Sequence, residues 1–246
     1  MERESPFRIA AIADLHYKRG SRGALREVFV AASREADVLA LCGDLTDNGL
    51  PQEARVLAED LREFAEIPVL AVLGNHDHEV DEAPAVRKIL ESVGVRLLDG
   101  EGVTVGGVGF AGTRGFAGGF GRWALNAWGE PVLKQFVAEA IREKEKLEGA
   151  LEGLRTERRV ALLHYSPVRS TCEGESLEIY PFLGSSHLEW AVDRFQVAAA
   201  FHGHAHGGSP HGQSVKGVPV YNVSLPVLRK RSPDSPPFRL VEVPPA

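Results

Sequence analysis

The stretch Val38-Leu-Ala-Leu-Cys-Gly-Asp44-Leu-Thr-Asp47 decides the fold, because a short apolar run leads through a glycine into two acidic side chains. Five consecutive apolar residues predict a buried β-strand. Gly43 allows the backbone to turn sharply and to pass close to a bound ion where the strand ends. The carboxylate of Asp44 is therefore expected at a strand end, where it can meet polar side chains from other strands.

Four further apolar runs lead into polar motifs in the same way. They are residues 7–13 before Asp14-Leu-His16, 69–73 before Gly74-Asn75-His76-Asp77, 160–163 before His164, and 197–201 before the segment that contains Gly203-His204-Ala-His206. If these strand ends converge, they offer two aspartates, one asparagine and four histidines, enough for two divalent ions that share one carboxylate. Oxygen and imidazole donors without a thiolate favour Mn, Fe, Zn, Ni or Co over Cu(I) or an iron–sulfur cluster.

A pair of ions explains why these residue types occur together. Two cations about 3.5 to 4 Å apart lower the pKa of a water held between them and clamp the attacking and leaving oxygens of a displacement at phosphorus. The two oxygens of Asp44 allow it to bridge, and Asn75 adds a neutral amide oxygen. His76 points away from its neighbour and can donate a proton to the leaving alkoxide, with Asp47 as the expected partner of its other ring nitrogen.

The five motifs, in this order, resemble the signature of the calcineurin-like metallophosphoesterases, and the match runs from Asp14 to His206. The resemblance implies that Asp14, His16 and His206 hold the first metal, that Asp44 bridges both, and that Asn75, His164 and His204 hold the second. It also implies a non-ligand role for His76, paired with Asp47. The implied activity is hydrolysis of a phosphate ester by hydroxide held between the two ions.

The fold class expected from the pattern is α/β, because strands and helices alternate in the first half of the chain. Further strands are predicted at residues 38–42, 95–98, 103–110, 218–223 and 238–243, and helices at 23–35, 51–65 and 84–93. Strands 95–98 and 103–110 are predicted to form a hairpin through the short connection 99–102. Mixed sheets follow, in agreement with the two-sheet sandwich flanked by helices that the family resemblance implies.

The segment 112–154 is expected to be an insertion within one domain that spans residues 1–246. Its first part combines six glycines with Phe116, Phe120, Trp123 and Trp128. Such a loop can be a mobile flap over a ligand, or its aromatic side chains can dock it on the core. The second part, 131–154, carries apolar residues at helical spacing and predicts a surface amphipathic helix.

Substrate contacts are less well specified than metal ligands. Arg114 and Arg169 follow strand ends and can bind phosphate oxygens, although arginines at such positions are often only solvated. The form Gly-Asn-His-Asp resembles cyclic-nucleotide-phosphodiesterase-like members of the family, so a phosphodiester is preferred over a phosphomonoester. Small monoesters and nucleotides stay open as substrates. The alternative function is a non-catalytic, metal-binding interaction scaffold of the same fold.

Charge and composition limit the partners. The formal net charge of −6 argues against long nucleic acid as a ligand, and no apolar run approaches the length needed to span a membrane. Two cysteines in 246 residues and the absence of a leader sequence indicate a cytoplasmic protein, with Cys42 and Cys172 structural. The basic cluster 228–232 is expected to be a solvated connector. His202 is a candidate for contact with the metal ligands, and the oligomeric state stays open.

Overall fold

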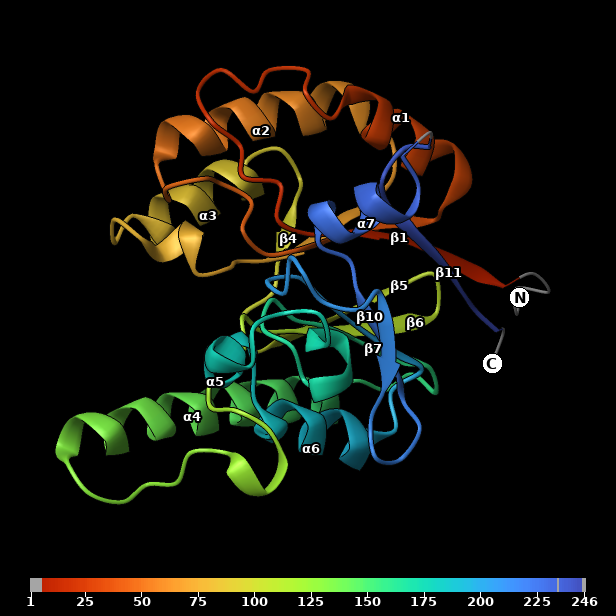
Figure 1. Cartoon of the computed structure of the whole chain (residues 1–246). Helices are drawn as coiled ribbons and strands as arrows, with labels where there is room; N and C mark the ends of the chain where they lie inside the picture. Colours follow the sequence, from red (N-terminus) through yellow and green to blue (C-terminus); the bar gives the residue numbers. More distant parts are fainter. Residues whose placement is uncertain (1–5, 234, 245–246) are drawn as a thin grey trace.

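Two β-sheets lie face to face in the centre of the computed structural model, and helices cover their outer faces (Figure 1). The structure describes residues 6–233 and 235–244. This arrangement confirms the predicted α/β sandwich with two mixed sheets. No helix among the described residues combines the length and apolar character required to cross a bilayer.

The first sheet has five strands, and four of them are parallel. Its order is β11 (Arg239–Val243), β1 (Phe7–Ile12), β2 (Val38–Cys42), β3 (Val69–Val72) and β4 (Arg96–Leu97), with β11 antiparallel to β1. Strands β2 and β3 are apolar and buried along their whole length, as expected for strands covered on both faces. Parallel pairing places the carboxyl ends of β1, β2 and β3 at the same edge of this sheet.

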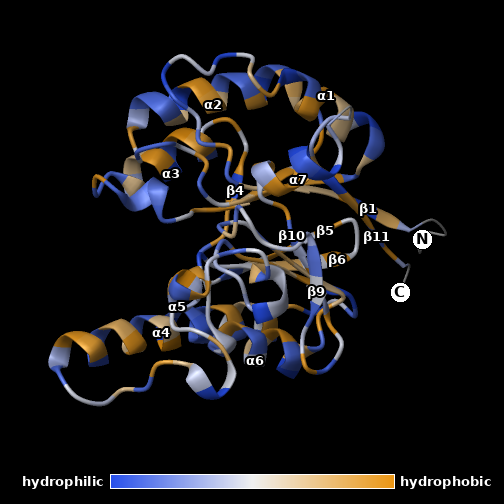
Figure 2. Ribbon diagram, in the orientation of Figure 1, coloured by the Kyte–Doolittle hydropathy of each residue, from blue (hydrophilic) through white to orange (hydrophobic). Residues whose placement is uncertain are grey.

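Helices α1, α2 and α3 cover the outer face of this sheet, and α7 lies in the same layer (Figure 1). Their bounds are α1 (Arg26–Glu35), α2 (Pro51–Phe64), α3 (Ala83–Glu91) and α7 (Leu225–Arg231). Figure 2 shows that they turn apolar residues toward the sheet and polar residues toward solvent. The basic side chains of the cluster 228–232 are exposed, as expected, but the prediction of a connector was wrong, because they lie in the last turn of a helix that buries Leu225 and Leu228.

The second sheet has six strands and is also mixed. Its order is β5 (Glu101–Val105), β6 (Val108–Gly112), β7 (Arg159–Leu162), β8 (Ala199–His202), β10 (Pro219–Asn222) and β9 (His211–Gln213). Strands β6, β7, β8 and β10 are parallel, and the two edge strands are antiparallel to their neighbours. Helices α4 (Pro131–Gly153) and α6 (Ser186–Phe195) pack against each other on its outer side, and the short α5 (Tyr180–Leu183) lies beside them.

The predicted hairpin between 95–98 and 103–110 was wrong. Strand β4 pairs with β3 in the first sheet, whereas β5 pairs with β6 in the second, so the connection at 98–100 carries the chain from one sheet to the other. The hairpin instead turns at Gly106 and Gly107, both of which have positive φ values (56° and 87°). A two-glycine turn of this kind matches the twist of the strands that it joins.

The glycine-rich loop that follows β6 is docked on the core through some of its aromatic side chains and exposes others. The ring of Phe116 lies 4.9 Å from that of Phe136 on α4, and Phe120 is buried, so this part of the loop is docked on the core. Trp123 and Trp128 are 75% and 66% exposed. The aromatic side chains therefore divide between packing and exposure to solvent.

Candidate metal centre

Potential metal ligands from five strand ends converge between the two sheets. The candidate ligands form three groups, and within each group one ligand atom per residue lies within 4.8 Å of those of the other two. The groups are Asp14, His16 and His206; His16, Asp44 and His76; and Asp44, His164 and His204. His16 and Asp44 each belong to two groups, so the three groups form one continuous cluster. Side chains separated by up to 192 positions in sequence thus meet in one place.

The first group surrounds the carboxylate of Asp14. Nε2 of His206 lies 2.9 Å from Oδ1 of Asp14, and the main-chain N–H of His204 donates to the same carboxylate. Burial raises the pKa of Asp14, but the hydrogen bond with His206 and the neighbouring imidazoles outweigh it, so the net pKa is lowered. Asp14 is therefore held as a carboxylate, the form that binds a cation.

Main-chain carbonyls fix the tautomers of the histidines in the third group. Nδ1 of His164 donates to the carbonyl of Cys42 (3.1 Å), which leaves Nε2 facing Oδ1 of Asn75 at 2.9 Å. Nε2 of His204 donates to the carbonyl of Phe182 (3.1 Å), which leaves Nδ1 with its lone pair. Burial lowers the pKa of His204 to about 3, so its ring is neutral and can act as a ligand.

Asp47 is the hydrogen-bond partner of His76, as expected, but through its main-chain carbonyl and not through its carboxylate. Nδ1 of His76 donates to the main-chain carbonyl of Asp47 at 2.7 Å, whereas the Asp47 carboxylate lies near Lys18 and Nδ1 of His16. The main chain of Asp47 therefore fixes the tautomer. Burial lowers the pKa of His76. The Asp47 carbonyl and the carboxylates of Asp44, Glu79 and Asp47 together raise it by more, so the net pKa is above its ordinary value.

The backbone at the cluster is held in an uncommon conformation. Asp14, His16, Asp44 and His204 have φ values of 59°, 46°, 49° and 68°, in the left-handed region that residues with a Cβ rarely occupy. Each such residue costs of order 1 to 3 kcal/mol, and strain of this kind gathers at functional sites. The turns aim consecutive side chains at one point.

Three glycines make the close approach of these loops possible. A Cβ on Gly43 would overlap the ring of His164, one on Gly74 would overlap the Asp44 carboxylate, and one on Gly203 would overlap the Asp14 carboxylate. Each glycine precedes a candidate ligand and packs against another one. This explains why a glycine occurs in each motif independently of the need for a turn.

Two buried polar residues support the ligand loops: Asp77, which was given no role in the sequence analysis, and His202, which was a candidate for contact with the ligands. Asp77 accepts hydrogen bonds from the main chain of Leu45, Thr46 and Gly74 and so joins the loop after β2 to the loop after β3. His202 is fully buried; its Nε2 lies 2.8 Å from the hydroxyl of Thr171, and its Nδ1 donates to the carbonyl of Gly203. The presence of Asp77 as the last residue of the motif Gly-Asn-His-Asp was the feature of the sequence that could have predicted this supporting role.

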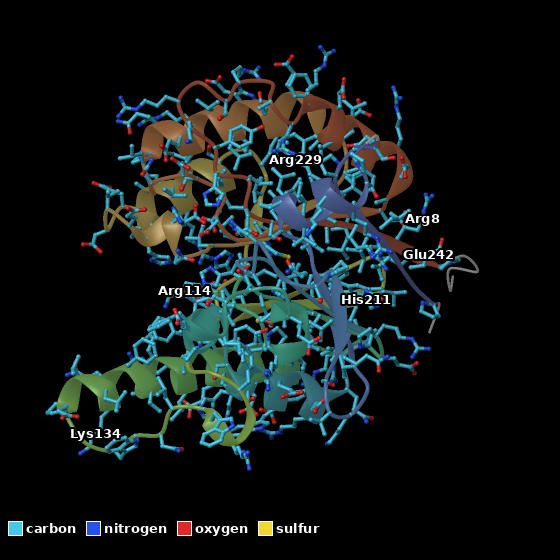
Figure 3. The ribbon with its side chains drawn as sticks, viewed as in Figure 1. Arg8, Arg114, Lys134, His211, Arg229 and Glu242 are labelled. Atoms are coloured by element: carbon cyan, nitrogen blue, oxygen red, sulfur yellow. The ribbon has the colours of Figure 1, made fainter. Side chains whose placement is uncertain are left out.

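The two arginines proposed as substrate contacts differ in their surroundings. Arg114 lies between the two layers (Figure 3) and lines a cavity of about 570 Å³ between α3 and α4, but its guanidinium is paired with Glu139 at 2.8 Å. Arg169 is exposed, and its guanidinium lies 5.5 Å from the centre of the Tyr180 ring. Among the described residues it forms no ion pair, so its charge is available to a ligand.

The donor set fits a pair of divalent cations. Nε2 of His16 is buried, lies 3.9 Å from Oδ2 of Asp44, and has no hydrogen-bond partner within the described part of the chain. A buried imidazole nitrogen without a partner is costly unless a cation or another ligand completes it. Together with the carboxylates of Asp14 and Asp44, both almost fully buried, this atom indicates a position for positive charge.

Comparison with known proteins agrees with the observed fold. The family model described as calcineurin-like phosphoesterase matches residues 7–208, and the chain therefore belongs to the calcineurin-like phosphoesterase family. The fold is similar to that of the phosphopantetheinyl hydrolase PptH from Mycobacterium tuberculosis (TM-score 0.66, 17% identity, 97% of each chain covered). It is also similar to TT1561 of Thermus thermophilus (TM-score 0.57, 15% identity, 97% of this chain and 99% of that one). A search of curated protein sequences finds no match.

Proposed function

We propose that this protein is a dinuclear-metal-dependent phosphoesterase with a preference for phosphodiesters. The observation that carries the proposal is the sharing of His16 and Asp44 between neighbouring groups of ligand atoms, because a shared carboxylate is what two adjacent ions require. In this proposal Asp14, His16 and His206 hold one ion, and Asn75, His164 and His204 hold the other. Asp44 contributes to both.

Two bound cations would supply water of lowered pKa and would neutralise charge on the phosphoryl oxygens. The protein supplies fixed ligand geometry, since the main-chain partners of His164 and His204 hold both rings in the tautomer that leaves one nitrogen free. Mn, Fe, Zn, Ni and Co all suit this combination of carboxylate, amide and imidazole donors.

His76 is proposed as the general acid. Its Nδ1 is occupied by the Asp47 carbonyl, so Nε2 is the atom free to meet the leaving oxygen, and the raised pKa of His76 favours the protonated ring. Asp47 acts through its main chain as a positioning residue. The histidine lies beside the metal ligands, with its ring centre 4.7 Å from that of His16.

Hydrolysis of a phosphodiester distinguishes an enzyme from the alternative, a non-catalytic interaction scaffold of the same fold. Metal-reconstituted protein is assayed with an aryl phosphodiester and the matching monoester, before and after treatment with a chelator. We expect chelation to abolish turnover, reconstitution to restore it, and kcat/KM to be higher for the diester. Undetectable hydrolysis of both esters by protein that retains its metal would favour the scaffold.

A further inference from the structure

Two cavities that share a wall lie against the glycine-rich loop that follows β6. The smaller has a volume of about 250 Å³ and is lined by Phe120, Trp123, Leu177 and Tyr180 together with Arg169. The larger, of about 710 Å³, shares Phe120, Trp123 and Arg169 with it. An aromatic wall next to an open cavity provides a surface on which a flat ring can lie.

The side chains of the smaller cavity are arranged for stacking. The rings of Phe120 and Tyr180 meet edge to face, with centres 6.5 Å apart and an interplanar angle of 88°. Trp123 exposes 75% of its surface, and the guanidinium of Arg122 lies 4.7 Å from the centre of its ring. Exposed aromatic rings beside arginines are the surface that proteins use to stack nucleobases without reading their sequence.

The segments that line the smaller cavity are connected to the loop that carries His204 and His206 by shared packing and by one hydrogen bond. Phe120 and Tyr180 pack in one cluster with Ala205, which lies between His204 and His206 in the chain. The carbonyl of Phe182, on the same short helix as Tyr180, accepts the hydrogen bond from His204. The short helix that contributes Tyr180 to the cavity therefore also contacts a candidate metal ligand.

The aromatic cavity differs from the cavity next to Arg114 in whether its positively charged side chains are paired with carboxylates. The arginine and lysine side chains that line the cavity of about 570 Å³ between α3 and α4 are all paired with carboxylates: Arg87 with Glu91 and Glu101, Arg114 with Glu139, and Lys146 with Asp99 and Glu143. Arg169 has no such partner among the described residues and lies over Tyr180. The aromatic cavity thus offers an available positive charge together with stacking surfaces, which is the combination that an anionic ligand with a flat ring requires.

We propose that the aromatic cavity formed by Phe120, Trp123, Tyr180 and Arg169 binds the base of a nucleoside phosphate ester. This inference rests on the proposed phosphoesterase function for its reaction, but binding of the base does not depend on turnover. The substrate class is then a nucleotide ester, and aliphatic phosphate esters are poorer substrates because they leave the stacking surface uncovered.

The test compares two esters that differ only in the base. Adenosine 5′-(methyl phosphate) carries the ring, and methyl ribofuranoside 5-(methyl phosphate) carries a methoxy group in its place. We expect wild-type KM to be lower for the nucleoside ester, and Trp123→Ala and Tyr180→Ala to raise that KM about tenfold. The same variants should leave KM for the base-free ester within about twofold, since stacking is absent there.

Trp128→Ala is the matched control, because Trp128 is exposed on the same loop but lines neither cavity. Tyr180→Phe keeps the ring and should retain the wild-type KM. Equal KM values for the two esters in the wild-type protein would overturn the inference while leaving the phosphoesterase proposal standing.

A binding measurement keeps the two proposals apart. Isothermal titration calorimetry with adenosine on metal-free protein should show binding that is lost in Trp123→Ala and retained in Trp128→Ala. If neither ester is hydrolysed but adenosine binds in this pattern, the phosphoesterase proposal fails and the base site stands. If adenosine does not bind the wild-type protein, or binds Trp123→Ala equally well, the base site is refuted.

Discussion

The buried carboxylate of Asp77 accepts hydrogen bonds from both the main-chain N–H and the hydroxyl of Thr46, at 2.8 and 2.6 Å. The same carboxylate accepts from the main chain of Leu45 and Gly74. Asp77 therefore joins the turn that carries Asp44 to the turn that carries Asn75, and one side chain sets the spacing of two candidate ligands.

Replacing Asp77 should destabilise the protein more than removing one of its partners. Asp77→Ala leaves several buried donors unpaired, and we expect the free energy of unfolding to fall by about 3 kcal/mol. Thr46→Val removes one hydroxyl group while it keeps the shape of the side chain, and it should lower the free energy of unfolding by about 1 kcal/mol. Chemical denaturation measures both values, and a smaller loss for Asp77→Ala than for Thr46→Val would contradict this account of the two turns.

Asp44→Asn should reduce metal occupancy. The substitution keeps the shape of the side chain but removes the negative charge that two cations would share, so we expect the metal bound per chain to fall and hydrolysis to be lost. Elemental analysis after reconstitution and desalting measures the occupancy. Asp81→Asn, an exposed aspartate in the loop before α3, is the control and should retain full occupancy.

His76→Ala should separate chemistry from metal binding. Removing a general acid typically lowers kcat by about 10² to 10⁴, while the proposed ligands stay in place. Steady-state kinetics and elemental analysis on the same preparation distinguish the two effects. Loss of one metal ion in His76→Ala would instead identify His76 as a metal ligand. Such a role is geometrically possible, because its ring nitrogen lies within 4.8 Å of ligand atoms of His16 and Asp44.

Gly203→Ala tests the close packing of the ligand loops. The added methyl group would overlap the Asp14 carboxylate, so we expect weaker metal binding and a lower melting temperature. Gly149→Ala is the matched control, since Gly149 lies within α4 and a Cβ there meets nothing within 4 Å. That control should raise stability by about 0.5 to 1 kcal/mol, and an equal response to both substitutions would refute the packing argument.

The strands that carry the metal cluster were predictable because their signal is local. Strand β2 matches its predicted bounds, β1 and β3 each end one residue earlier than predicted, and β7 is shifted by one residue toward the N-terminus. Each is an apolar run that ends at a glycine or at a polar motif. The sheet assignment of β4 and β5 was not predictable in this way, because strand pairing depends on partners that are distant in sequence. The turn at Gly106 and Gly107 was missed because residues 103–110 were predicted as one continuous strand.

The partners of the candidate site residues were harder to predict than the residues themselves. The pattern placed Asp47 near His76, but only the three-dimensional turn shows that its main-chain carbonyl is the atom in contact. Similarly, Arg114 follows a strand end as expected, yet Glu139 reaches it from α4, a helix whose packing the sequence does not specify. Main-chain contacts and pairs between distant elements leave no local pattern.

Electron paramagnetic resonance of the protein loaded with Mn²⁺ reports whether two ions are bound side by side. Two ions that share Asp44 are close enough for their spins to couple, so we predict two Mn²⁺ per chain and a coupled spectrum that is lost in Asp44→Asn. A single uncoupled Mn²⁺ per chain, unchanged by Asp44→Asn, would contradict the dinuclear centre.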